Sequence, residues 1–236
     1  MKQLYLLLIT LLVSLSTYAE ESGTCGKHLK WKLTAEGVLT ITGTGKMKNY
    51  SGSSRPWSAY KNVIKQVIID DGVTTIGYSA FYRCSSLTSI TIPNSVTTIG
   101  SSAFSSCSSL TSVTIGNGVR TIEGGAFSSC SSLASITIPN SVRTIGGLAF
   151  SYCSSLASIT IPNSVTRIWH SAFYGCKNIK QITSEAVTPP GCSRYTFKGV
   201  NTRECKLIVP QNSIDAYKKA NGWKKFFLIE GTTTGI

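Results

Sequence analysis

The sequence predicts an α/β repeat solenoid, in which short units stack in one direction instead of folding around a single central core. Three observations support this fold class. A 23-residue pattern recurs along the middle of the chain, each copy ends in an alternating apolar and polar stretch, and each copy keeps one phenylalanine and one cysteine in place. The composition agrees, because 42% of the 236 residues are hydrophobic and only 14% are charged, which is typical of an ordered protein.

Residues 1–19 have the pattern of a secretory signal peptide. Lys2 precedes an apolar run from Leu4 to Leu15, and small residues lead to a cleavage position after Ala19. The run is shorter than the ~20 residues that span a bilayer. Cys25 does not directly follow the cleavage position, which argues against a lipid anchor. We therefore expect a secreted or cell-surface protein without membrane insertion.

Residues 20–72 are predicted to form an N-terminal β cap and a first rung. The stretch HLKWKLTAEGVLTITGTGKM, residues 28–47, alternates like two strands joined by a turn at residues 35–37. A stack of repeats needs such a cap because its first unit exposes an open strand edge and an apolar core. Trp57 and Tyr60 are expected to close the core, and Ile64, Val67 and Ile69 resemble an early rung.

Residues 73–187 hold five 23-residue copies. The copies read VTTIGYSAFYRCSSLTSITIPNS, VTTIGSSAFSSCSSLTSVTIGNG, VRTIEGGAFSSCSSLASITIPNS, VRTIGGLAFSYCSSLASITIPNS and VTRIWHSAFYGCKNIKQITSEAV. In the first copy, Leu87, Ile90 and Ile92 define a half-buried strand that ends at Pro93. Ile76, with the recurring pair Ala80 and Phe81, fits a short helical or tight-turn return behind the strand. Neither part can bury its apolar side alone, so the copies must stack.

Stacking places equivalent residues above one another at about 4.8 Å. The cysteine ladder then consists of Cys84, Cys107, Cys130, Cys153 and Cys176, beside a phenylalanine column of Phe81, Phe104, Phe127, Phe150 and Phe173. Five thiols cannot all pair, and disulfide geometry is tighter than the rung spacing. Metal ligands would have to converge on one point instead of following a line. Buried free thiols are the expectation, with stacked disulfides as the alternative, and no metal or other cofactor is predicted.

Residues 188–236 are predicted to form an irregular last rung and a C-terminal α/β cap. Ser213 begins a short helix over IDAYKKA, Asn221 and Gly222 end it, and a strand follows at residues 226–229. Cys192 and Cys205 lie outside the cysteine ladder. They are either an oxidised pair or two free thiols, because sequence spacing does not fix their separation.

The sequence offers no convergent set of catalytic groups. Its two histidines, His28 and His170, lie far apart in the sequence, and the adjacent carboxylates Asp70 and Asp71 fit a turn. We therefore predict a protein that is not an enzyme. Without Lys2, 22 basic residues face 10 acidic ones, but the stretch 73–164 carries only Arg83, Arg120, Glu123 and Arg143. The basic residues concentrate at the two ends, with no basic stripe interleaved with aromatics, which argues against nucleic acid as a partner.

Binding is the remaining function, and two surfaces are candidates. The residues between the buried strand positions should face outward and cover one side with hydroxyl groups: Ser89, Thr91, Ser112, Thr114, Ser135, Thr137, Ser158, Thr160, Gln181 and Thr183. Arg120 and Arg143, one rung apart, could bind a sulfate or carboxylate, with Arg167 one position further along in the next copy. A merely soluble β surface and a solvated arginine row remain the alternatives.

The strand pattern Leu-x-x-Ile-x-Ile and the longer pattern Val-x-x-Ile-x-x-x-Ala-Phe-x-x-Cys-x-x-Leu-x-x-Ile-x-Ile-Pro-x-Ser resemble the BspA-like leucine-rich repeats of bacterial surface and secreted proteins. The resemblance covers residues 73–187 and implies a right-handed superhelix with a parallel sheet on one face. It also implies adhesion to host extracellular-matrix proteins, or to other host or bacterial surface proteins. Binding to anionic glycans, or a spacer role without a ligand, are the alternatives.

Overall fold

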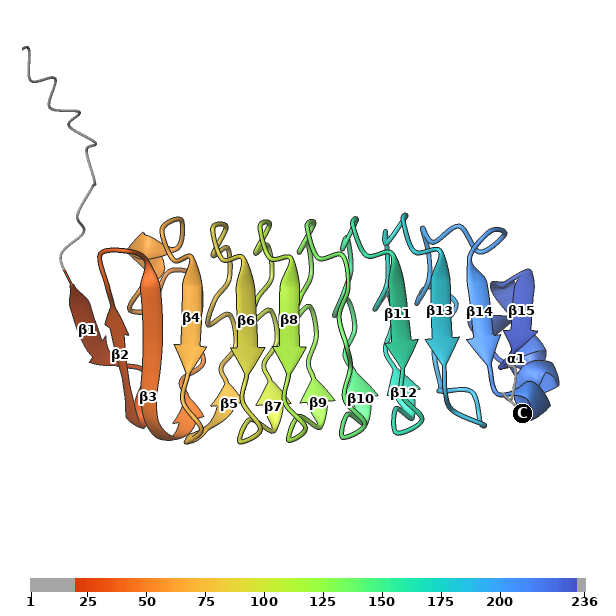
Figure 1. The fold of residues 1–236 in the computed structure, drawn as a ribbon, viewed down its shortest axis with the longest axis horizontal. Helices are drawn as coiled ribbons and strands as arrows, with labels where there is room; N and C mark the ends of the chain where they lie inside the picture. The colour runs from red at the N-terminus through yellow and green to blue at the C-terminus, as the bar shows by residue number, and fades with distance from the viewer. Residues whose placement is uncertain (1–19, 233–236) are drawn as a thin grey trace, which may run out of the picture.

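The computed structural model describes residues 20–232, which form an elongated stack with the N-terminal cap at one end and the C-terminal cap at the other (Figure 1). Each 23-residue copy adds one turn of the chain, here called a rung. The predicted signal peptide, residues 1–19, lies outside the described residues, as do residues 233–236. Within residues 20–232, no helix has the length and apolar character required to cross a membrane.

The N-terminal cap is an antiparallel unit of three strands, β1 (Glu21–Thr24), β2 (Gly26–Leu33) and β3 (Val38–Met47). The predicted hairpin is β2 and β3, and β1 was not predicted. The first half of β3 pairs in parallel with β4, and its second half pairs with β5. One long strand therefore starts both of the parallel sheets that run through the repeats.

The first parallel sheet follows the predicted Leu-x-x-Ile-x-Ile strands. Its members after β3 are β4 (Gln66–Ile69), β6 (Ser89–Ile92) and β8 (Ser112–Ile115), and after an interruption β11 (Ser158–Ile161), β13 (Gln181–Ser184), β14 (Lys206–Val209) and β15 (Leu228–Gly231). The register equals the repeat length, since Ser89 pairs with Ser112 and Ser158 with Gln181. The predicted one-over-one stacking is confirmed.

The interruption falls at residues 135–138, where a strand was predicted. In the described chain this stretch pairs with its neighbours only through a bridge between Thr137 and Thr160. The cause is the residue that follows each strand. Where that residue has an N–H, the N–H donates to a backbone carbonyl of the preceding rung, and the strand forms four residue pairs with its neighbour. This is the case at Asp70, Gly116, Glu185 and Thr232. Where it is proline, this bond is missing and fewer pairs form: three before Pro210, two before Pro93, one before Pro162 and none before Pro139.

A second parallel sheet was not predicted. It is built from the start of each copy by β5 (Val73–Ile76), β7 (Thr98–Ile99), β9 (Thr121–Ile122), β10 (Thr144–Ile145) and β12 (Arg167–Ile168). Thr98 pairs with Thr121 and Thr121 with Thr144, again 23 residues apart. These strands are too short to show an alternation of apolar and polar residues that could be distinguished from the turn that follows.

The return segments are turns, so the helical alternative considered for them is wrong. Two residues of each turn have left-handed backbones, such as Ser102 with φ 54° and Ser106 with φ 61°. Between them, alternate N–H groups donate to the next rung: Ser102 to Gly124, Phe104 to Ala126 and Ser106 to Ser128. The small residues Ser and Gly occupy most of these positions because bulky side chains are disfavoured in the left-handed region.

The core consists of columns of identical side chains. Successive rings of the phenylalanine column stack with centroids 5.2 to 5.6 Å apart and planes within 15° of parallel. The five thiols of the cysteine ladder are buried and free, as predicted. Four of them donate to the phenylalanine carbonyl of the preceding rung, at 3.0 to 3.2 Å. The ladder therefore contributes hydrogen bonds between rungs in addition to its packing.

Tryptophans close both ends of the phenylalanine column. Trp57 is fully buried before the 3-10 helix η1 (Ser58–Tyr60), stacks on Phe81 at 5.8 Å and donates from Nε1 to the Ala80 carbonyl at 2.8 Å. At the other end Phe197 extends the column, and Trp223 lies 4.9 Å from its ring. Tyr60, the other residue expected at the N-terminal end, is partly buried against the core.

The C-terminal cap contains the 3-10 helices η2 (Gln211–Ser213) and η3 (Trp223–Lys225) and one helix, α1 (Ile214–Lys219), at the predicted place. Gly222 follows α1 with φ 80°, consistent with the predicted stop. β15 runs over Leu228–Gly231, two residues later than predicted. Cys192 and Cys205 are free thiols, so the oxidised pair is not formed in this structure.

Candidate binding surfaces

The predicted hydroxyl columns lie on the outer face of the first parallel sheet, here called the strand face. All ten predicted residues of this face are exposed except Thr183, which is half-buried. Their buried neighbours Ile90, Val113 and Ile159 point into the core, so the alternation is as predicted. From β6 to β11 the outward positions carry no charged side chain. The strand positions of this face therefore offer uncharged hydroxyl groups to solvent.

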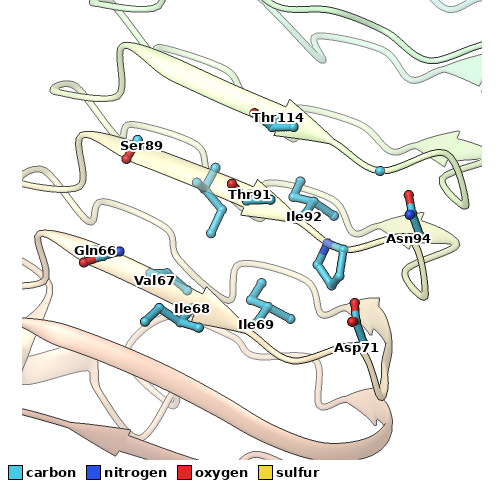
Figure 2. Close-up of a pocket in the computed structure, with 13 residues that line it drawn as sticks. Gln66, Val67, Ile68, Ile69, Asp71, Ser89, Thr91, Ile92, Asn94 and Thr114 are labelled. Atoms are coloured by element: carbon cyan, nitrogen blue, oxygen red, sulfur yellow. The ribbon is translucent and has the colours of Figure 1, made fainter.

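A groove of about 550 Å³ crosses the N-terminal part of the strand face, over β4, β6 and β8 (Figure 2). Ser89, Thr91 and Thr114 line it, together with Asp71 and Asn94 from the loops at the strand ends. A second groove of about 500 Å³ lies further along, over Thr137 and Thr160. Both grooves lie where a strand passes into its proline turn, so the sheet and its loops form them together.

Two residues of the first groove were missed by the sequence analysis. Gln66 and Ile68 of β4 hold the outward positions that Ser89 and Thr91 hold in β6. The Ile68 side chain is 42% exposed, which places an apolar residue in line with the threonine column. Aligning IKQVIIDDGV with the five copies would have revealed this exception.

Arg120 and Arg143 lie on another side of the molecule, beside the second sheet. Both are exposed, and the Arg143 N–H donates to the Arg120 carbonyl at 2.9 Å, so the two residues occupy successive rungs. With Asn117 and Ser141 they line a hollow of about 360 Å³. Arg167 is in β12, one position further along the rung, and does not line this hollow.

The remaining polar candidates do not come together. His28 is exposed on β2, whereas His170 is exposed near the other end of the stack. Asp70 and Asp71 form the predicted turn between β4 and β5. Within residues 20–232, no group of three or more His, Cys, Asp or Glu side chains could hold a metal ion.

The ladder thiols are poor nucleophiles. Burial in the core raises the pKa of Cys84, Cys130 and Cys176 to about 12. Burial also raises the pKa of Cys107 and Cys153 well above the usual value for a thiol. Because the thiolate is the reactive form, these side chains stay protonated and unreactive at neutral pH.

Comparison with known proteins identifies the repeat. A family model for the BspA type leucine rich repeat region matches residues 58–180 in six copies. Among solved structures, a leucine-rich repeat protein from Eubacterium ventriosum is 21% identical with a TM-score of 0.65, and the match covers 92% of this chain and 73% of that one. The leucine rich repeat protein of T. pallidum is 26% identical with a TM-score of 0.53, over 88% of this chain and 81% of that one. No curated protein matches the chain.

The six matched copies include the rung of β4 before the five copies counted in the sequence. The two structural likenesses agree with a parallel solenoid of leucine-rich repeats. Since the matched region makes up more than half of the 236 residues, this chain belongs to the family of BspA-type leucine-rich repeat proteins.

Proposed function

We propose that this protein is an exported bacterial binding protein that attaches to proteins on host or bacterial surfaces, with extracellular-matrix proteins as the first partner class. The single observation that carries the proposal is the strand face, whose outward strand positions from β6 to β11 carry no charge and which holds two grooves, with Asp71 and Glu185 at their loop ends. Repeat proteins use such an extended face as their contact surface. The family resemblance supports the same reading, as do the signal-peptide features of the sequence. The function proposed is binding without catalysis.

A protein partner fits the strand face better than a polyanion does. The outward positions from β6 to β11 offer hydroxyl groups but no lysine or arginine. Ile68 adds an exposed apolar side chain at one end of the face. The centre of a protein interface is depleted of charged side chains, and the outward positions of these rungs meet that requirement.

The test is saturable binding of the full mature chain to a panel of immobilised matrix proteins and host cells. Thr91→Lys combined with Thr114→Lys places two charges on the strand face and should lower affinity about tenfold or more, because charge is costly at the centre of an interface. Thr97→Lys is the matched control, since Thr97 is exposed on the other side and its position holds arginine in the next two rungs. Absence of saturable binding to the whole panel would refute the adhesive role.

Anionic-glycan binding by the arginine row is a second candidate function. Arg120 and Arg143 share one hollow, although other copies carry threonine at this position. Arg120→Thr with Arg143→Thr should then shorten retention on a sulfated-glycan column. Unchanged elution would count against this candidate. A spacer without a ligand is the remaining alternative, and a protein that binds neither matrix proteins nor glycans would favour it.

A further inference from the structure

A third groove lies where the last full repeat meets the C-terminal cap. It measures about 380 Å³, within the range of small-ligand sites. Three separate segments contribute its lining, namely the end of β12, the irregular last rung and the loop after α1. The side chains are Arg167, Trp169, His170, Cys192, Ser193 and Asn221.

The repeats themselves show that the fold does not require these side chains. The position of Arg167 carries Thr98, Thr121 and Thr144 in the three preceding copies, and the position of Trp169 carries Gly100, Glu123 and Gly146. Those copies make the same rung-to-rung hydrogen bonds and the same core columns. Stacking of one repeat on another therefore does not account for the large side chains of the last repeat.

Trp169 and Arg167 form a preorganised pair. The Arg167 guanidinium lies 4.9 Å from the centre of the Trp169 ring, within the range of a cation–π contact. The indole remains 45% exposed, far more than a core tryptophan. Its backbone is fixed, because the Trp169 N–H donates to the Ile145 carbonyl at 2.9 Å. A flat apolar surface and a planar cation are thus presented together to solvent.

His170 extends this surface toward the neighbouring rung. A Cβ atom placed on Gly147 would lie 2.8 Å from Cε1 of the His170 ring, so the absence of a side chain at Gly147 makes room for the imidazole. On the opposite side, Ser193 and Asn221 add a hydroxyl and an amide to the lining. These groups can donate and accept hydrogen bonds with ligand hydroxyls.

The charge around the groove favours an anion. No carboxylate is among the residues that line it. Residues 177–232 carry ten lysines and arginines against four acidic residues. The Lys225 ammonium donates to the Arg194 carbonyl at 2.9 Å, which adds a positive charge close to the last rung. Two of the acidic residues already pair with lysines: Glu204 with Lys180, which directly precedes β13, and Glu230 with Lys206 of β14.

We propose that this groove binds an anionic glycan. A pyranose ring lies against the exposed indole of Trp169, whose negative ring face attracts the C–H groups of the sugar. The carboxylate or sulfate group of that sugar is bound by Arg167, and Ser193 and Asn221 bind its hydroxyl groups. The site is separate from the strand face and does not depend on the proposed protein adhesion. It is also separate from the hollow of Arg120 and Arg143.

The test is calorimetric titration of the full mature chain with oligosaccharide fragments of three glycans. Heparin bears sulfates, hyaluronan has carboxylates as its only charged groups, and dextran is neutral. We expect binding of at least one charged glycan and none of dextran. Arg167→Thr with Trp169→Ala should lower that affinity about tenfold or more, because a charged hydrogen bond and a stacking surface are both lost. Both substitutions introduce small residues, as most of the preceding rungs have at these positions, so the variant should still fold. A thermal unfolding curve checks this.

Arg83→Ser is the matched control, since it removes one exposed arginine outside every groove described above and introduces the serine of the next two copies. We expect a change of less than about twofold, because an isolated surface charge contributes little. An equal loss in both variants would indicate diffuse attraction to a basic protein and overturn the proposal. Tighter binding of poly(dT) than of either charged glycan, or no glycan binding at all, would overturn it as well.

Discussion

The Sγ atom of Cys107 donates a hydrogen bond to the carbonyl oxygen of Phe81 at 3.1 Å, across 26 residues of sequence. The same bond joins Cys130 to Phe104 at 3.2 Å. A thiol at this position fills the core and also contacts the backbone of the rung before it. This explains why one residue type recurs in every copy although no two of these thiols form a disulfide.

We expect the ladder thiols to be inert in the folded protein. They are fully buried and burial keeps them protonated, so an aromatic disulfide reagent at neutral pH should reach at most the half-buried Cys192. In denaturant all eight cysteines should react. The absorbance of the thiolate released from the reagent measures the number of reactive thiols in native buffer and in denaturant. Rapid reaction of the ladder thiols in native buffer would contradict their burial.

The same thiols should make stability fall in alkali. Burial raises the pKa of Cys84, Cys130 and Cys176 to about 12, from 9.0 for an ordinary thiol. Below the lower value both folded and unfolded chains keep the protons, so the stabilisation is fully present. As pH rises from about 9 to 12 the unfolded chain ionises first, and this stabilisation is lost.

Urea unfolding at increasing pH measures this loss. A variant with Cys130→Ala provides the control, because it removes one titrating group and should flatten the decline. A midpoint that does not change between pH 8 and pH 10 would contradict the expectation.

Phe127→Ala should destabilise the protein by about 3–5 kcal/mol, as expected for a buried phenylalanine. Its ring lies 5.3 Å from Phe104 and 5.6 Å from Phe150, so the truncation leaves a gap inside a continuous stack. Thr137→Ala, on the exposed strand face of the same copy, should change stability by less than about 0.5 kcal/mol. Chemical denaturation compares the two, and similar midpoints would argue against the ring column as a source of stability.

Pro139→Ala should restore strand pairing at the interruption of the first sheet. The new N–H can donate to the Ile115 carbonyl, as the Gly116 N–H donates to the Ile92 carbonyl at 2.9 Å. Hydrogen exchange measured residue by residue should show a protected amide at position 139 and slower exchange at residues 135–138. Thr137→Ala serves as a control that changes a side chain without adding a donor. An unprotected amide at position 139 would show that proline is not the cause.

The sequence predicted what repetition determines. The period of 23 residues predicted the register, the phenylalanine column and the burial of the ladder. Identical copies can bury their equivalent apolar side chains against one another only when they stack in register. The outward columns followed from alternation alone, as with Ser89 and Thr91.

Three features depended on single residues or short segments and were not predicted. β1 pairs with β2 through a stretch without apolar alternation, and the two-residue strands of the second sheet are too short to carry a periodic signal. The interruption at residues 135–138 depends on the N–H that Pro139 lacks. On the candidate surfaces, Trp169 and Ile68 differ from their equivalents in other copies, and only a residue-by-residue comparison of the copies reveals them.

The identity of residues 130–142 and 153–165 has a consequence for how this protein changes over generations. Where the coding sequences of two such copies match as closely as their residues do, they can recombine out of register, which inserts or deletes one unit of 23 residues. Each new junction would present the same donors, acceptors and rings as the old one, so the two caps would simply move apart or together by about 4.8 Å. The length of the stack is then a quantity that selection can adjust in steps, without redesigning either end.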